Sequence, residues 1–210
     1  MLKFLCSCDN RQCGEEMSKS SPIGKLTDAV FGFALAVGAL SLTARNPETT
    51  LDVVGGLSMF TLSFVILIVI WWGTSNLMSK LSPDRPTTTF LNIVLLFFVA
   101  IEPYLLNLLN FSVTLFPLST TLYAVDMFFL MAITAALSHI LIKENKELAP
   151  QELRRYRRGR NNQSIFACLF LLSTLPWFLD FALAGVPIRI LLWLATLALS
   201  IATSGRSRNR

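Results

Sequence analysis

Charged residues are scarce in this chain. Asp, Glu, Lys and Arg make up 15% of its 210 residues, whereas soluble domains normally carry about 25%. Hydrophobic residues account for 53%, and the mean hydropathy is +0.58. This balance excludes an ordinary soluble domain and predicts a membrane protein. The formal net charge of +5 does not indicate a nucleic-acid partner, because the basic residues cluster at the ends of apolar segments.

Residues that bind metals are also few. The one histidine, His139, has no Cys or Glu at ligand spacing, so we expect it to bond a neighbouring helix. Cys6, Cys8 and Cys13 match no zinc pattern; we interpret them as free thiols, with palmitoylation or weak metal binding as alternatives. Cys168 is expected to be a packing residue. The sequence predicts neither a metal site nor a cofactor.

Catalytic motifs are missing as well. The chain has no nucleophile elbow, P-loop, dinucleotide fingerprint or zincin motif, which argues against an enzyme. It also has no TVGYG-like loop, so the ordinary filter of potassium channels is absent. The apolar run at residues 4–6 is too short for a signal peptide, and we expect the first span to direct membrane insertion.

What the chain does contain is six apolar segments near the roughly 20 residues that cross a bilayer. They predict an all-α membrane protein with spans at 26–43, 54–76, 90–109, 121–142, 165–183 and 186–203. Residues 1–25 form an N-terminal tail, 143–163 a long hydrophilic loop, and 204–210 a basic C-terminal tail. We treat 26–203 as one transmembrane domain.

The positions of the basic residues set the orientation. With both termini in the cytoplasm, 16 of the 18 Lys and Arg lie inside, and only Arg45 and Arg189 lie outside. The basic run 154–160 is interpreted as a topology anchor against anionic headgroups, with an RNA-binding or phosphoinositide-binding patch as the alternative.

Four acids lie in or at the edge of predicted spans: Asp28, Glu102, Asp126 and Asp180. Each needs a partner, water, a position near the interface or a proton. We expect Asp28 to cap a helix or pair with Lys25 or another basic residue. Asp126 and Asp180 are expected near the headgroups, where they would be solvated.

Glu102 is followed by Pro103, which should kink or break the third span. Glu102 then either lines an aqueous vestibule or accepts hydrogen bonds from backbone groups freed at the break. It also carries the alternative function, in which Glu102 and Asp126 serve a proton-coupled or substrate transporter.

The first span is unusually rich in small residues, which let helices approach closely: Gly32, Ala34, Ala36, Gly38 and Ala39. We therefore interpret it as an inner helix, one that lines a pathway.

Phe33, Val37 and Leu40 recur on one stripe of this helix, with Gly32 and Ala36 beside them. Rings of these side chains from several subunits would form hydrophobic constrictions. Glu48 and Asp52, just beyond the helix, would attract cations at the outer mouth. The same stripe is also compatible with a packing seam, and periodicity does not decide between the two.

Three motifs resemble a known family. Residues 26–34 read Leu-Thr-Asp-Ala-Val-Phe-Gly-Phe-Ala, Ser63-Phe64 is followed by Trp71, and residues 96–103 end in Val-Ala-Ile-Glu-Pro. In this order and spacing they resemble the transmembrane protein 175 family of potassium-permeable channels. The resemblance covers about the first half of the chain.

The resemblance implies six-helix subunits that assemble as homotetramers, with the first helices lining the pore. By alignment from Asp28 it assigns the constrictions to Phe33, Val37 and Leu40. It also marks five family-motif positions as structural: Leu26, Thr27, Asp28, Trp71 and Pro103.

This sequence departs from the family pattern at several positions. Leu26 and Thr27 stand for the motif's Phe and Ser, its Arg falls at Pro22, and Thr74 and Ser75 occupy the places of two frequent histidines. The network that ties the helix ends together in relatives must therefore be rebuilt or lost.

The leading hypothesis is a homotetrameric, potassium-permeable channel in a cell membrane, surrounded by lipid and without nucleic-acid partners. The subunit length suggests a prokaryotic source. Besides the transporter already named, a third possibility is a membrane scaffold that docks partners through residues 154–160 and the N-terminal cysteines.

Overall fold

The computed structural model describes residues 22–43, 49–81, 85–109, 116–144, 149–180, 182–183, 186–189, 191–193 and 195–196. Helices make up almost all of this part of the chain. In order they are α2 (Pro22–Thr43), α3 (Thr50–Met78), α4 (Pro86–Leu108), α5 (Phe116–Glu144), α6 (Pro150–Leu172) and the short α7 (Trp177–Asp180). The antiparallel strands β1 (Ala182–Leu183) and β2 (Val186–Pro187) follow.

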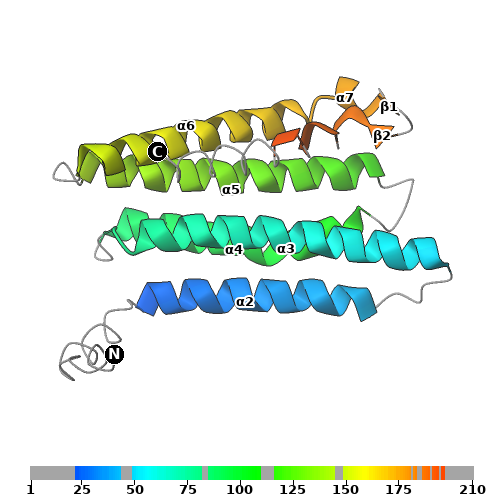
Figure 1. Ribbon diagram of the computed structural model, residues 1–210, viewed down its shortest axis with the longest axis horizontal. Helices are drawn as coiled ribbons and strands as arrows, with labels where there is room; N and C mark the ends of the chain where they lie inside the picture. The colour runs from blue at the N-terminus through cyan, green and yellow to red at the C-terminus, as the bar shows by residue number, and fades with distance from the viewer. Residues whose placement is uncertain are drawn as a thin grey trace, which may run out of the picture.

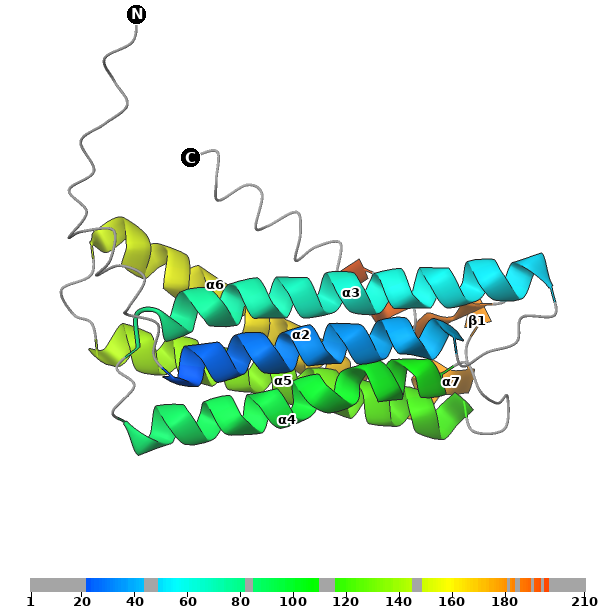
Figure 2. The same ribbon diagram turned by 90° about the horizontal axis from the view of Figure 1, so that it is seen from below.

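The long helices run up and down in a bundle (Figure 1). Helix α2 forms an outer layer, α3 and α4 lie in the middle, and α5 and α6 lie on the other side. The view from below shows α2 between α3 and α4 (Figure 2), and α2 contacts both of them.

Among the described residues, four helices are long and apolar enough to cross a membrane: α2 over Ile23–Leu40, α3 over Val53–Met78, α4 over Pro86–Leu108 and α5 over Phe116–Glu144. Hydrocarbon offers no partners to backbone N–H and C=O groups, so apolar segments of this length bond internally as helices. At 1.5 Å per residue, α5 with its 29 residues is about 43 Å long, longer than the roughly 30 Å hydrocarbon core. The predicted all-α membrane fold is confirmed.

The second half of the chain departs from the predicted spans. Helix α6 begins at Pro150, inside the stretch expected to be a hydrophilic loop. It ends at Leu172, and a turn separates it from α7. The expected span 165–183 is therefore not one continuous helix. Pro176 explains the interruption, because it lacks a backbone N–H and disfavours helix at the residue before it.

The chain reverses direction after α7. Ala182 pairs with Pro187 and Leu183 with Val186, where the expected span 165–183 ends and the expected span 186–203 begins. Only parts of the expected span 186–203 are described, and those beyond β2 are helical. Both predicted tails lie outside the described residues, except for 22–25, which already belong to α2.

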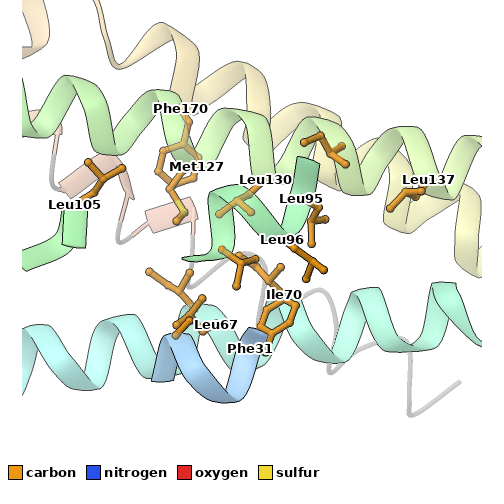
Figure 3. Close-up of a cluster of buried hydrophobic side chains, with 14 of the residues drawn as sticks. Phe31, Leu67, Ile70, Leu95, Leu96, Leu105, Met127, Leu130, Leu137 and Phe170 are labelled. Carbon is orange, nitrogen blue, oxygen red and sulfur yellow. The ribbon is translucent and has the colours of Figure 1, made fainter. Parts of the chain in front are cut away.

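The core lies where the central helices meet (Figure 3). Leu95 and Val99 from α4 and Leu130 and Leu137 from α5 are fully buried. Phe31 is the large side chain that α2 contributes. Figure 3 shows it beside Ile70 of α3, so the middle layer anchors α2 to the bundle.

Ion pairs join helix ends at one end of the bundle. Arg85 Nη1, just before α4, lies 2.8 Å from Glu144 Oε1 at the end of α5. Lys80 Nζ, just after α3, lies 2.8 Å from Glu152 Oε1 in the first turn of α6. The hydrogen bond that Lys80 Nζ donates to Glu152 Oε1 raises the pKa of Lys80 above its ordinary value. Most basic side chains of the described chain belong to this end, because it also includes the N-terminal half of α6.

Candidate functional site

Helix α2 buries one narrow face. Thr27, Phe31, Ala34 and Gly38 are buried, and their spacing of four, three and four residues follows one side of an α-helix. This side contacts α3 and α4. Only 22% of the residues in the Ile23–Leu40 window are buried, against 50% in the span of α5. Most of α2 must therefore be covered by lipid or by another chain.

The predicted stripe lies on the uncovered side of α2. Phe33 is 67% exposed and Leu40 is 65% exposed. Val37 is half-buried, and Gly32 and Ala36 are exposed. A Cβ atom at Gly32 would meet nothing within 4 Å. Phe33 and Leu40 therefore do not pack within the described part of the protomer.

Two family-motif positions meet near the N-terminal end of α2. Trp71 Nε1 of α3 donates a hydrogen bond to Asp28 Oδ1, at 2.8 Å. Asp28 was expected to cap a helix or pair with a basic residue, and within the described chain it instead accepts from an indole. The contact joins α2 to α3 at the level of the motif.

A second polar contact joins α2 to α4. Asn92 Nδ2 donates to Thr27 Oγ1 at 3.0 Å, and Thr27 Oγ1 in turn donates to the Ile23 carbonyl at 2.9 Å. Both side chains are buried. Thr74, at a position where relatives carry histidine, is buried, and its hydroxyl has no hydrogen-bond partner among the described residues. Thr27 and Asn92 thus join α2 to α4 through a buried polar contact.

Close packing joins α2 to its neighbours further along. A Cβ atom on Gly38 would lie 3.7 Å from the Phe60 ring of α3 and 3.8 Å from Pro103 Cβ of α4. Helix α4 continues through Pro103 to Leu108, so the expected break does not occur. Leu26, the remaining motif position, is 50% exposed.

Glu102 and Asp126 lie inside the protomer. Glu102 is 0% exposed and Asp126 is 2% exposed. Ser63 Oγ of α3 donates to Glu102 Oε2 at 2.8 Å, whereas Glu102 Oε1 and both Asp126 oxygens have no hydrogen-bond partner in the described chain. The expectation that Asp126 is solvated near the headgroups was wrong, because only 2% of the residue is exposed in the protomer. Glu102 lines no solvent-filled vestibule, and its described partner is a side chain.

Arg189, which the predicted orientation assigns to the outer side of the membrane, is also buried in the protomer. It is 0% exposed, and its Nη1 donates to Thr120 Oγ1 at 2.8 Å and to Thr121 Oγ1 at 3.1 Å. Trp193 lies nearby, with its ring centroid 5.0 Å from that of Tyr123. Through these contacts the segment that follows β2 packs against α5.

The other residues singled out in the sequence provide little further evidence of a functional site. Cys168 is exposed, so the expectation of a packing residue was wrong. His139 Nδ1 lies 3.2 Å from Arg160 Nη1 of α6. Glu48 and the side chains of Asp52 and Asp180 lie outside the described part. No group of three His, Cys, Asp or Glu side chains that would hold a metal occurs among the residues the structure describes.

Fold and site together define a multi-pass α-helical membrane protein whose first helix turns an apolar, small-residue face outward. Residues 23–103 match the family described as "Endosomal/lysosomal potassium channel TMEM175". This match supports the resemblance over that segment, which is less than half of the chain. All the motif positions except Pro22 lie within the matched segment.

A solved structure shares the fold. It is described as the crystal structure of a threonine-to-alanine variant of the potassium channel MtTMEM175, in complex with a nanobody–MBP fusion protein. The similarity covers 91% of this chain and 95% of that one, with a TM-score of 0.64 and 19% sequence identity. The likeness therefore extends well beyond the segment of the family match. No curated protein matches the chain.

Proposed function

We propose that this chain is one subunit of a potassium-permeable channel whose pore is lined by α2. The observation that carries the proposal is the outward-facing apolar stripe of Phe33, Val37 and Leu40 on a helix whose opposite side is packed. The family description and the name of the similar solved structure support potassium as the permeant ion.

The chemistry of this face suits a hydrophobic gate. Rings of apolar side chains obstruct ions by dewetting, and they discriminate by how readily an ion sheds its hydration shell. Gly32 and Ala36 beside the stripe allow neighbouring helices to approach closely. Glu48 and Asp52 just beyond α2 would enrich cations at the outer mouth. In this proposal no cofactor takes part besides the permeant ion.

The protomer alone does not enclose a pore at α2, so the function requires copies of the chain. We propose a homotetramer in a prokaryotic cell membrane, with α2 from each subunit facing a shared axis. We propose that both termini lie in the cytoplasm, as the positions of the Lys and Arg residues predict. The ion pairs Arg85–Glu144 and Lys80–Glu152 would then lie on the cytoplasmic side, in keeping with the excess of Lys and Arg there.

The alternative, a transporter that works through Glu102 and Asp126, is less well supported. Exposures of 0% and 2% leave neither acid accessible to a substrate from outside the protomer. The exposed stripe of α2 needs a partner or lipid, whereas the two acids are enclosed. These facts favour a pore at α2 over a carrier route through the acids.

The proposal is tested with purified protein in liposomes. Potassium flux is expected in the wild type, and Leu40→Ala should raise it because a ring of smaller side chains dewets less readily. Phe97→Ala on α4, where the side chain is 60% exposed, is the matched control and should leave flux unchanged. Absence of flux, or equal flux in the wild type and Leu40→Ala, would overturn the assignment.

A further inference from the structure

We propose that Glu102 and Asp126 form a proton-binding site inside each protomer, distinct from the α2 face. At neutral pH the two carboxyl groups together hold at least one proton. The site lies between α3, α4 and α5, and it does not depend on the proposed channel function.

The geometry leaves carboxyl oxygens without donors. Ser63 Oγ reaches Glu102 Oε2 at 2.8 Å. Glu102 Oε1, Asp126 Oδ1 and Asp126 Oδ2 are buried without a hydrogen-bond partner among the described residues. Ionised carboxylates only accept hydrogen bonds. Two ionised groups here would place an excess of acceptors over donors in one buried site.

The surrounding elements supply little compensating charge. Helix α5 contributes Tyr123 as well as Asp126, and Glu102 is within electrostatic range of both. Helix α3 contributes the hydroxyl of Ser63. Arg189, a buried cation packed against α5, bonds Thr120 and Thr121, and no ion pair between it and either acid occurs among the described residues. On α2, Asp28 lies ten residues before Gly38, about 15 Å along the helix.

A proton is the simplest occupant of such a site. Burying an isolated ionised carboxylate is so costly that the group neutralises instead, and two neighbouring carboxylates disfavour each other's ionisation. One bound proton removes one negative charge and creates one donor. A metal cation would need a shell of several oxygen ligands, whereas a proton needs a single oxygen.

The location gives the bound proton a route to α2. Glu102 directly precedes Pro103, and Pro103 packs against Gly38. Release of the proton would place a negative charge one residue away from this contact. The site is therefore positioned to make the packing of α2 depend on pH.

The test is infrared spectroscopy of the full-length protein in lipid at neutral pH. Wild-type protein should show the C=O stretch of a protonated carboxyl group, and Glu102→Gln or Asp126→Asn should remove it or reduce it. Ser63→Ala keeps both acids and removes only the 2.8 Å hydrogen bond, so a Glu102 band should shift to higher frequency. Glu152→Gln, at an exposed carboxylate, is the control and should leave the band unchanged.

Two results would overturn the proposal. The first is a wild-type spectrum without a protonated carboxyl band, or a band that survives in both Glu102→Gln and Asp126→Asn. The second is a band that disappears when potassium or sodium is added at constant pH, which would assign the site to a metal cation. If the acid variants do not fold, the wild-type and Ser63→Ala spectra still test the proposal. A carboxyl band that is unshifted in Ser63→Ala and is lost when potassium or sodium is added excludes a proton on Glu102.

Discussion

Phe31 and Phe33 lie two residues apart on α2 and should respond to truncation in opposite ways. Phe31 is 2% exposed and belongs to the core, whereas Phe33 is 67% exposed. Replacing a buried Phe by Ala leaves a cavity and costs about 3–5 kcal/mol. Phe31→Ala should lose stability by roughly this amount.

Truncation of Phe33 should lower the stability of the protomer much less than truncation of Phe31. A buried aromatic side chain covers about 200 Å², and about a third of that at about 25 cal/mol per Å² gives at most about 1.7 kcal/mol. Lipid contact lowers the figure further, because acyl chains are themselves apolar. Phe33→Ala should therefore leave the protomer folded and change only what the outward face does, raising potassium flux and lowering discrimination against sodium.

The assay combines denaturant titration of helicity in micelles with flux in liposomes. The expected pattern is a large loss of stability in Phe31→Ala and an altered flux in a stable Phe33→Ala protein. Equal stability losses in the two variants would refute the packing reasoning. Unchanged flux and selectivity in a folded Phe33→Ala protein would refute the role of this face.

Three further outcomes follow from the contacts around α2 and the bundle end. A double-mutant cycle between Thr27→Ala and Asn92→Ala, measured by unfolding in mixed micelles, should give a coupling energy of about 0.6 kcal/mol and no more than about 1.7 kcal/mol. A coupling energy of zero would contradict the 3.0 Å hydrogen bond between the two side chains. Gly38→Ala should be tolerated, because its methyl group would lie 3.7 Å or more from its neighbours. Gly38→Leu should disrupt the packing of α2 against α3 and α4, which would raise the accessibility of cysteines introduced on the buried side of α2. Equal accessibility in the two variants would contradict the close contact at Gly38. Glu152→Gln should lower the free energy of unfolding by less than about 1 kcal/mol, since the pair with Lys80 is exposed. Because the pKa of Lys80 is raised in the folded protein, its stabilising contribution is complete at pH below the unfolded-state pKa and is lost as the pH rises through the folded-state pKa. The stability advantage of the wild type should therefore vanish in alkali, and an advantage that grows there would contradict this prediction.

The sequence predicted the spans well where long apolar runs determine the helix. The chain after Glu144 was harder to predict, because hydropathy does not detect a polar helix. The start of α6 nevertheless has a local signal: Pro150 occupies the first turn with Glu152 beside it. Its interruption also has one, since Pro176 disfavours helix at the preceding residue.

The candidate site was predicted in part for a related reason. Periodicity identified the stripe that contains Phe33, but it cannot tell an outward face from an inward one. Position along a span suggested solvation of Asp126, whereas burial depends on which helices pack around it. Asn92, a polar residue within an apolar run, was the available signal for the contact with Thr27, because buried amides in membrane helices bond neighbouring helices.

The most direct test of the pore at α2 is cross-linking between subunits at Leu40. The variant carries Leu40→Cys after Cys6, Cys8, Cys13 and Cys168 have been replaced by Ser, and the comparison protein carries Phe97→Cys in the same background. Mild oxidation in the membrane should yield covalent dimers from Leu40→Cys and few from Phe97→Cys. Dimers from Phe97→Cys with none from Leu40→Cys would contradict an assembly in which α2 helices face one another.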